Sequence, residues 1–327
     1  MARKIILIIL GCIVGIVLVG IIGINVYMHV AYSKFYNISE FPWDMPGMND
    51  GFVIQDSAYM DSADLWLYSG YMDNHTPSPV WRYHHDGSYD KFYIQLPDGS
   101  NYTGHAGGIT SYNKWVYVVS EDEGCVILNA EDVAHAKDGA TITAVHQMTL
   151  DCAPAFINVI GNTLYTGEFY REGTQYLTPD THHIVGSDGT ENPALMYQYE
   201  LSESCEYGFE PENPTAVYSI GADTQGCTLT PSGNFVFSTS WGLEASHLYI
   251  YDGSNFAPMG TYFIGGKNVP LYMFSSDRLI EDLKVPPMSE GINTKDGKIW
   301  MVDEAASNKY FFGKLYGFFK VAALTID

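Results

Sequence analysis

The chain contains five pairs of short segments rich in apolar residues at a period of two, and a tight turn separates the two segments of each pair. The second pair shows the pattern: a glycine-rich start at 104–110 leads into a turn at 111–114 and then into the apolar run 115–120. This period around a tight turn is typical of a β-hairpin. The pattern therefore predicts hairpins at 52–71, 104–120, 154–168, 225–240 and 289–304.

Further strand-like segments follow the hairpins. After the first hairpin they lie at 80–83 and 92–96, and after the fourth they lie at 248–251 and 260–263. Four strands per unit, repeated along the chain, indicate the blades of a β-propeller, which pack face to face around a central channel. We therefore predict an all-β chain in which 47–327 form one β-propeller domain.

The number of blades is open between five and six. Five units are visible, and the long inserts at 178–192 and 269–284 leave room for a sixth. A β-sandwich would also show short alternating strands. It would not explain the polar, glycine-containing start that recurs before the hairpins, so we favour the propeller.

A long apolar segment without charge runs from Ile5 to about Tyr27. At 1.5 Å per residue, about 23 helical residues span roughly 34 Å, which is enough to cross a bilayer. The apolar region of a secretory signal peptide is shorter, at about 7–15 residues. We therefore predict a single transmembrane anchor at 1–30 and a tether at 31–46.

Two basic residues, Arg3 and Lys4, precede this apolar segment. The positive-inside rule then places the N-terminus in the cytoplasm and the propeller outside the cell. The propeller region contains an even number of cysteines, which permits two disulfides outside the cell, and buried free thiols are an equal alternative. These cysteines are Cys125, Cys152, Cys205 and Cys227.

The chain of 327 residues is strongly acidic, with a formal net charge of −22 at pH 7. Nucleic-acid binding requires a Lys/Arg surface that neutralises phosphates, so this charge argues against a nucleic-acid partner. An acidic surface suits a solvated exterior and is compatible with cation binding.

Standard catalytic motifs are missing from the sequence, which has no H-E-x-x-H, G-x-S-x-G, G-x-G-x-x-G or P-loop pattern. The pairs His84-His85 and His182-His183 fall at a predicted turn and in an insert. We expect both to be solvated loop histidines rather than metal ligands.

The repeat itself supplies better candidates, because equivalent positions of different blades converge on the axis of a propeller. The start of each hairpin and the end of its second strand lie at the same end of the channel. Buried carboxylates there need a cation, a metal or a proton as partner. One mouth of the channel should gather Gln55, His105, Gln225, Glu290, Glu168 and Glu304.

Binding of a small molecule, a glycan or a surface protein is the function that we expect for this polar, carboxylate-rich pocket. Tyr71, Trp241 and Tyr310 would ring it, and aromatic faces with polar groups suit sugars. A first alternative is a hydrolase of esters or lactones, in which the carboxylates hold Ca²⁺ and His105 is the general base. A second is a non-catalytic scaffold for a membrane partner. The same residues could also only satisfy one another around trapped water.

Some segments also resemble known proteins. The segments 104–109, 289–292 and 303–307 look like those of uncharacterised bacterial extracellular propeller proteins. More distantly, an apolar N-terminus before a propeller with a carboxylate-rich mouth resembles the gluconolactonase and paraoxonase group. That resemblance implies a Ca²⁺-dependent lactonase or esterase. It further implies that Glu290 and Glu304 are metal ligands and that His105 is the base.

Overall fold

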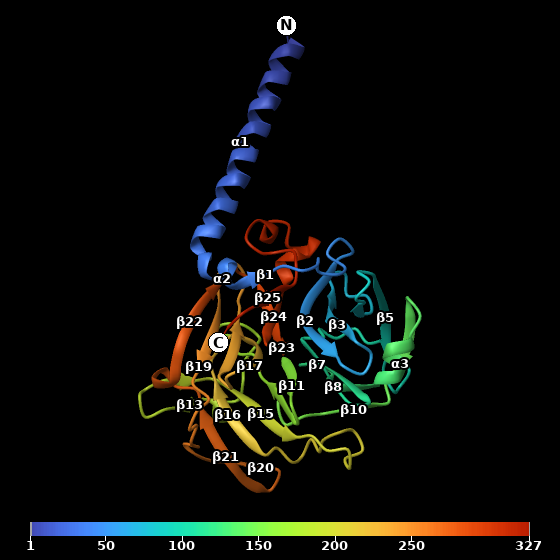
Figure 1. The fold of residues 1–327 in the computed structure, drawn as a ribbon, viewed down its shortest axis with the longest axis vertical. Coiled ribbons are helices and arrows are strands. Elements are labelled where there is room, and N and C mark those ends of the chain that lie inside the picture. The colour runs from blue at the N-terminus through green and yellow to red at the C-terminus, as the bar shows by residue number, and fades with distance from the viewer. Residues whose placement is uncertain (1, 327) are drawn as a thin grey trace.

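The computed structural model describes residues 2–326 and shows a ring of β-sheets with one long helix projecting from it (Figure 1). This helix is α1 (Ala2–Ala31), and the short helix α2 (Ser33–Ile38) follows it. Five sheets of four or more strands form the ring, and β13 (Ile184–Val185) and β14 (Glu191–Asn192) pair separately in a loop. The prediction of a β-propeller after an apolar N-terminal helix is confirmed.

The first sheet includes one strand from the stretch of chain that forms the second sheet. The strand order is β2-β3-β4-β5-β9 in the first sheet and β6-β7-β8-β10 in the second. Strand β9 follows β8 and the short helix α3 (Ala130–His135), but it pairs in parallel with β5. The strands are β2 (Phe52–Met60), β3 (Leu65–Met72), β4 (Pro79–Tyr83), β5 (Tyr89–Gln95), β6 (Gly108–Tyr112), β7 (Trp115–Ser120), β8 (Gly124–Asn129), β9 (Ala140–Thr143) and β10 (His146–Met148).

The third sheet has six strands in the order β11-β12-β15-β16-β21-β20. Its two outermost strands form a hairpin that lies much later in the chain and joins the sheet through a parallel pairing of β16 with β21. The strands are β11 (Phe156–Ile160), β12 (Thr163–Gly167), β15 (Ala194–Glu200), β16 (Ala216–Ile220), β20 (Gly260–Ile264) and β21 (Lys267–Met273). The loop before β13 contains the 3-10 helix η1 (Asp180–His182).

The fourth sheet is completed by a strand from beyond this hairpin. Its order is β17-β18-β19-β22, so the segment 260–263, predicted as its fourth strand, belongs to the third sheet instead. The strands are β17 (Thr224–Leu229), β18 (Phe235–Thr239), β19 (Ser246–Tyr251) and β22 (Leu279–Val285), with η2 (Ser276–Arg278) before β22. The insert at 269–284 therefore supplies strands to the third and fourth sheets, the insert at 178–192 forms η1 and the separate β13–β14 pair, and neither contains a sixth blade.

The fifth sheet joins the two ends of the chain. Its order is β23-β24-β25-β1, in which β1 (Ser39–Glu40) comes from the N-terminal region and pairs antiparallel with β25 (Ala322–Leu324). Its other strands are β23 (Ser289–Lys295) and β24 (Lys298–Asp303). The segment 31–46, expected to be a tether, thus contains both α2 and a strand of the propeller.

The ring closes through its inner strands. Strands β2, β6, β11, β17 and β23 contact one another in this order, and β23 also contacts β2. Neighbouring sheets cover both faces of an inner strand, so every residue of β2 except Tyr59 is buried. The apolar core consequently lies between the sheets. All five cysteines are free thiols, and Cys125 and Cys227 are buried in different sheets.

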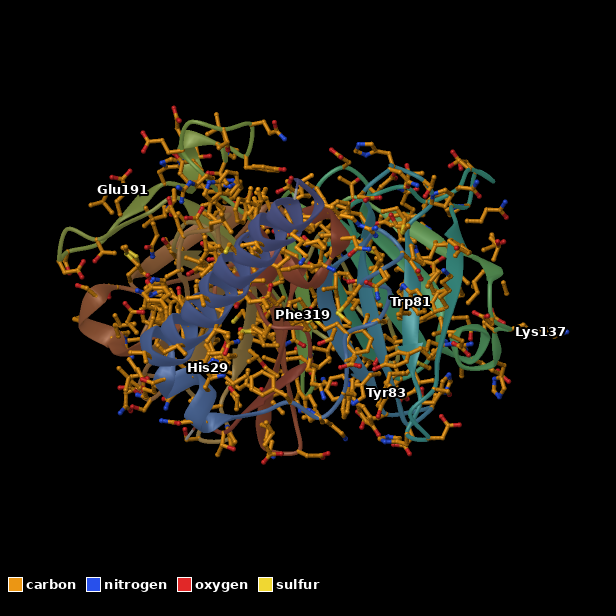
Figure 2. All side chains as sticks on the ribbon, turned by 90° about the horizontal axis from the view of Figure 1, so that it is seen from above. His29, Trp81, Tyr83, Lys137, Glu191 and Phe319 are labelled. Atoms are coloured by element: carbon orange, nitrogen blue, oxygen red, sulfur yellow. The ribbon has the colours of Figure 1, made fainter. Side chains whose placement is uncertain are left out.

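The N-terminal helix is exposed along most of its length but is held at its end. Its segment Arg3–Ala31 is long and apolar enough to span a membrane. Met28 near the end of α1 and Tyr32 just after it are buried against the fifth sheet, in one cluster with Phe35 and Phe318. Figure 2 looks onto this side of the ring, where α1 crosses in front of the sheets near Phe319.

Three 3-10 helices lie between β24 and β25, on the side of the ring from which α1 leaves (Figure 1). They are η3 (Glu304–Ala306), η4 (Asn308–Tyr310) and η5 (Gly313–Leu315). Helix η3 contacts β2, and η5 contacts α1. This C-terminal segment therefore connects the central channel to the N-terminal helix.

Candidate functional site at the channel mouth

Three inner strands are irregular at equivalent positions. The pairing register shifts at Gln55 in β2, at Gln225 in β17 and across Glu290 and Gly291 in β23. A β-bulge leaves the extra residue unpaired and redirects its side chain. The residues that the sequence repeat aligned are thus the ones that leave the regular ladder near the mouth.

A chain of hydrogen bonds links side chains from three of the predicted segments. His105 Nε2 donates to Gln55 Oε1 at 2.7 Å, and Gln55 Nε2 donates to Glu304 Oε2 at 3.2 Å. The Tyr310 hydroxyl also donates to Glu304 Oε2, at 3.1 Å, and lies 3.2 Å from the Tyr71 hydroxyl. These five predicted site residues therefore lie together, and we refer to them with Glu290 as the central site.

The hydrogen bonds determine which ring nitrogen of His105 carries the proton. Gln55 Nε2 also donates to the Ile54 carbonyl at 3.1 Å, so the amide oxygen of Gln55 faces the histidine. His105 Nε2 is then the protonated nitrogen, and Nδ1 of the neutral ring carries the free lone pair. Burial of the charged form, with repulsion from Lys309, lowers the pKa of His105 to about 4. The imidazole is therefore neutral at pH 7.

The His105 ring is nevertheless open to a ligand. The residue is exposed to solvent at the mouth, although protein surrounds most of the ring. The Tyr71 ring lies against it at a centroid distance of 4.2 Å. A concave site of this kind destabilises an imidazolium ion while leaving one edge of the ring accessible.

Two glutamates at the mouth have strongly perturbed acidity. Burial raises the pKa of Glu304 to about 7, against the lowering effects of the Tyr310 hydrogen bond and of the Lys309 charge. Burial and the neighbouring Glu304 charge raise the pKa of Glu290 well above its usual range. Glu290 is only 2% exposed, and no side chain in the described part of the chain donates to its carboxylate. Lys309 thus offsets the charge of Glu304, whereas Glu290 has, among residues 2–326, neither a donor nor a cation that lowers its pKa.

Two buried aspartates hold the backbone around these glutamates. Asp56 accepts hydrogen bonds from its neighbour's amide at 2.8 Å and from the Ile109 amide at 3.0 Å. A Cβ atom on Gly291 would lie 2.1 Å from Asp56 Oδ1, so only glycine allows this approach. Asp303 accepts from the amides of Ala305 and Phe318 at 2.7 and 3.0 Å. Both carboxylates are structural, and the sequence pattern did not identify them.

Lys309 also belongs to the central site, although no sequence pattern indicated it. Its ammonium lies 4.5 Å from the centroid of the Tyr71 ring and 4.9 Å from that of Tyr310, and it donates to the Tyr71 hydroxyl. It is exposed on the short helix η4. No repeat signal could have shown it, because η4 has no counterpart in the other blades.

Glu168 lies outside the central site. It accepts from His182 Nδ1 at 2.9 Å and from the Leu195 amide at 3.0 Å, and it is 3% exposed. His182, expected to be a solvated loop residue, is buried because η1 folds back onto the third sheet. The insert therefore supplies the partner of this carboxylate.

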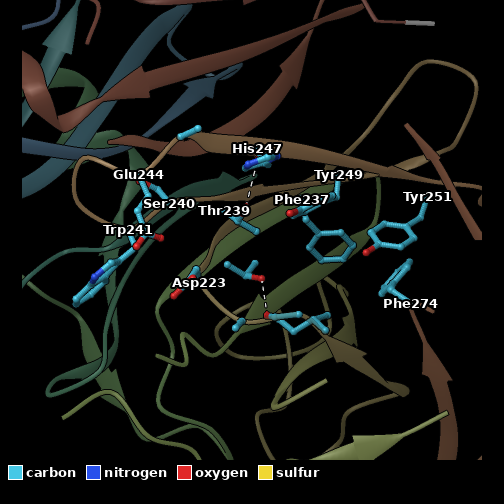
Figure 3. Close-up of a pocket in the computed structure, with 15 residues that line it drawn as sticks. Asp223, Phe237, Thr239, Ser240, Trp241, Glu244, His247, Tyr249, Tyr251 and Phe274 are labelled. Atoms are coloured by element: carbon cyan, nitrogen blue, oxygen red, sulfur yellow. Dashed lines mark hydrogen bonds between the residues drawn. The ribbon is translucent and has the colours of Figure 1, made fainter. Parts of the chain in front are cut away.

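Trp241 belongs to a separate pocket between the third and fourth sheets, with a volume of about 430 Å³ (Figure 3). Its ring is flanked by Phe169 at 6.1 Å and by the Arg171 guanidinium at 5.1 Å. Tyr249 and Tyr251 line the same pocket. Trp241, predicted to ring the mouth with Tyr71 and Tyr310, therefore lies in this pocket, whereas the two tyrosines lie at the central site.

The remaining predicted ligands do not form a metal site. Gln225 is half-buried at its bulge in β17, and within residues 2–326 no hydrogen bond joins it to the central site. Within the same residues, no group of three or more His, Cys, Asp and Glu side chains is arranged to hold a metal ion. Ca²⁺ takes six to eight oxygen ligands. Glu290 and Glu304 alone do not fit that requirement, so we derive no step through Ca²⁺.

Comparison with known proteins identifies no family for this chain. No protein-family model matches the chain, and no curated protein matches it. Solved structures that resemble it include the pyrroloquinoline-quinone-bound aldose sugar dehydrogenase of Streptomyces coelicolor, at 13% identity and a TM-score of 0.38, over 81% of this chain and 78% of that one. The resemblance to gluconolactonase and paraoxonase is not confirmed.

Two further structures span nearly the same length. A Thermus thermophilus oxidoreductase described as a glucose dehydrogenase is 12% identical at a TM-score of 0.43, over 88% of this chain and 99% of that one. The WD40 propeller domain of Doa1 is 7% identical at a TM-score of 0.41, over 88% and 96%. These low values carry no argument about function. The chain is a five-bladed β-propeller preceded by a helix that is long and apolar enough to span a membrane.

Proposed function

We propose that this protein is a membrane-anchored, extracellular β-propeller that binds a ligand carrying an ammonium group at the central site. The observation that carries the proposal is the position of the Lys309 ammonium, which lies over the faces of Tyr71 and Tyr310. Aromatic faces attract cations, by about 0.5–2 kcal/mol depending on desolvation. The site thus already holds a cation of its own.

The charge balance of the central site supports the same ligand class. Burial and the neighbouring Glu304 charge raise the pKa of Glu290, and no side chain among residues 2–326 donates to the Glu290 carboxylate. Lys309 is the nearby positive charge that lowers the pKa of Glu304. Because Lys309 is exposed on a short helix, its ammonium can leave, and a ligand ammonium can take its place.

The proposed topology follows from the N-terminal segment. Arg3 and Lys4 precede the apolar part of α1, which favours a cytoplasmic N-terminus and an extracellular propeller. Protease protection of the full chain in intact cells would test this. Cleavage within the propeller only after permeabilisation would contradict the orientation.

The ligand class is tested by calorimetry on the full chain in detergent micelles, with three sugars that differ at one group. We expect D-glucosamine, which carries an ammonium, to bind, and glucose and N-acetylglucosamine not to bind. Lys309→Met keeps the length of the side chain but removes the internal cation, so it should tighten glucosamine binding by about tenfold, equal to about 1.4 kcal/mol. Glu304→Gln should weaken it. Equal binding of all three sugars, or no effect of Lys309→Met, would refute the proposal.

One observation favours a second candidate, ester or lactone hydrolysis. His105 is neutral and accessible, and its Nδ1 lone pair is free to take a proton from an attacking water. If it is a general base, p-nitrophenyl acetate hydrolysis should depend on pH with an inflection near 4 and vanish in His105→Gln. Background rates in wild type would eliminate this candidate.

A further inference from the structure

The C-terminal segment between β24 and β25 exposes an aromatic pair. Phe311 and Phe312 are 76% and 71% exposed, and Phe319 is 41% exposed. Their rings contact each other edge to face, at 5.4 Å between the centroids of Phe311 and Phe312. Exposed, contiguous aromatic side chains of this kind mark interaction surfaces rather than ordinary solvated loops.

This segment lies beside the N-terminal helix. Helix η5 contacts α1, and Ile24 of α1 packs against the apolar cluster that contains Phe318. In Figure 1 the segment rises from the ring on the side from which α1 leaves. The aromatic pair and the last turns of the apolar helix are therefore close to the same level.

The ring cannot move far from the end of the helix. Met28 and Tyr32 are buried in the propeller core, whereas Val30 between them is 70% exposed. The exposed apolar surface of α1 thus continues to the point where the helix meets the ring. If α1 spans a bilayer, the propeller lies directly against the bilayer surface without an intervening flexible linker.

The charge of the segment differs from that of the rest of the chain. Residues 305–320 contain Lys309, Lys314 and Lys320 and no acidic residue, in a chain whose net charge is −22. Lysines flanking exposed aromatic residues are typical of surfaces that lie in the interface of a bilayer with anionic lipids. The segment therefore suits a lipid surface rather than an acidic solvated exterior.

We propose that Phe311, Phe312 and Phe319 enter the interfacial layer of the same bilayer that holds α1, with Lys314 facing anionic headgroups. The inference rests on the proposed membrane anchoring of α1. The protein would then contact its membrane at two places, which fixes the orientation of the ring. Helix η4, with Lys309 and Tyr310 of the central site, lies within this contact segment. The membrane contact is therefore continuous with the binding site.

The test places a tryptophan at the proposed contact in the full chain, reconstituted into nanodiscs that contain phosphatidylglycerol and brominated lipid. Phe311→Trp should lose at least about half of its added emission, because interfacial aromatic residues lie at headgroup level, within reach of the bromines. Phe263→Trp is the matched control. Phe263 is likewise an exposed phenylalanine, at 69%, but it lies on β20 at the outer edge of the third sheet. Its added emission should not change.

The outcomes separate this inference from the anchoring on which it rests. Extraction of the wild-type protein from the membrane by alkaline carbonate would show that α1 does not span the bilayer. Retention of the protein with an unquenched Phe311→Trp would overturn only the second contact. Equal quenching of Phe311→Trp and Phe263→Trp would also overturn it, because lipid would then reach the ring without preference.

Discussion

The acidity of Glu304 leads to a quantitative prediction for Glu304→Gln. Burial raises the pKa of this carboxyl from its ordinary value of 4.5 to about 7. The folded state then binds a proton that the unfolded state has released between these two pH values. Stability is therefore lost as the pH rises through this window, and the loss is complete above the folded-state pKa.

The magnitude follows from the same values. Each tenfold change in proton affinity is worth about 1.4 kcal/mol, so a rise from 4.5 to about 7 corresponds to about 3 kcal/mol. Because Glu304 is partly accessible to solvent, we expect about 2–3 kcal/mol. Glutamine cannot ionise, but its oxygen can still accept from Tyr310 and Gln55. Glu304→Gln should therefore unfold with a free energy about 2–3 kcal/mol higher than wild type at pH 8, and with no difference at pH 4.

The assay is urea unfolding of the full chain in detergent micelles between pH 4 and 8, followed by tryptophan fluorescence. Glu172→Gln is the control, because it makes the same substitution at a glutamate that is exposed in a loop. A difference between Glu304→Gln and wild type that is the same at both pH values would refute the reasoning. So would a variant less stable than wild type at pH 8.

Three further predictions concern the support of the site and the closure of the ring. Gly291→Ala should lower the free energy of unfolding by about 3 kcal/mol or more, because the new methyl group would overlap Asp56. Gly260→Ala has open space around it and should lower it by less than about 1 kcal/mol, and urea unfolding of both variants measures the difference. His182→Ala removes the only side-chain partner that buried Glu168 has within residues 2–326 and should cost about 3–5 kcal/mol in thermal unfolding. The double variant with Glu168→Gln should recover part of this loss. A chain that begins after β1 leaves β25 as an open edge and should aggregate, as size-exclusion chromatography would reveal; a monodisperse product would contradict the role of β1 in closure.

The last of these predictions also concerns the anchor. Because β1 completes the fifth sheet, the segment that follows α1 is part of the fold and not only a connection to it. The same sheet contains Glu290 on β23, and Glu304 begins η3 directly after β24. Helix α1 is therefore connected to the sheet that contains Glu290 through the pairing of β1 with β25.

Local patterns in the sequence determined the helix, the hairpins and the class of fold. The uncharged apolar run predicts α1 from length alone, and period-two runs around tight turns predict hairpins, because both signals depend only on neighbouring residues. The repeat also aligned Gln55, Gln225 and Glu290, which the structure places at equivalent bulges. Gln55, Tyr71, His105, Glu290 and Glu304 share one mouth for the same reason, since the repeats are related by rotation about one axis, whereas Tyr310 comes from η4 outside the repeats.

Contacts between distant parts of the chain decided the rest. The blade number depended on the β20–β21 hairpin joining the third sheet across a parallel pairing, and closure depended on β1 meeting β25 from the opposite end of the chain. Lys309 enters the site from a segment without a repeat counterpart, and Glu168 leaves it because His182 folds back from an insert. Such pairings are chosen by burial and charge in the assembled core, and no local pattern of residues encodes them.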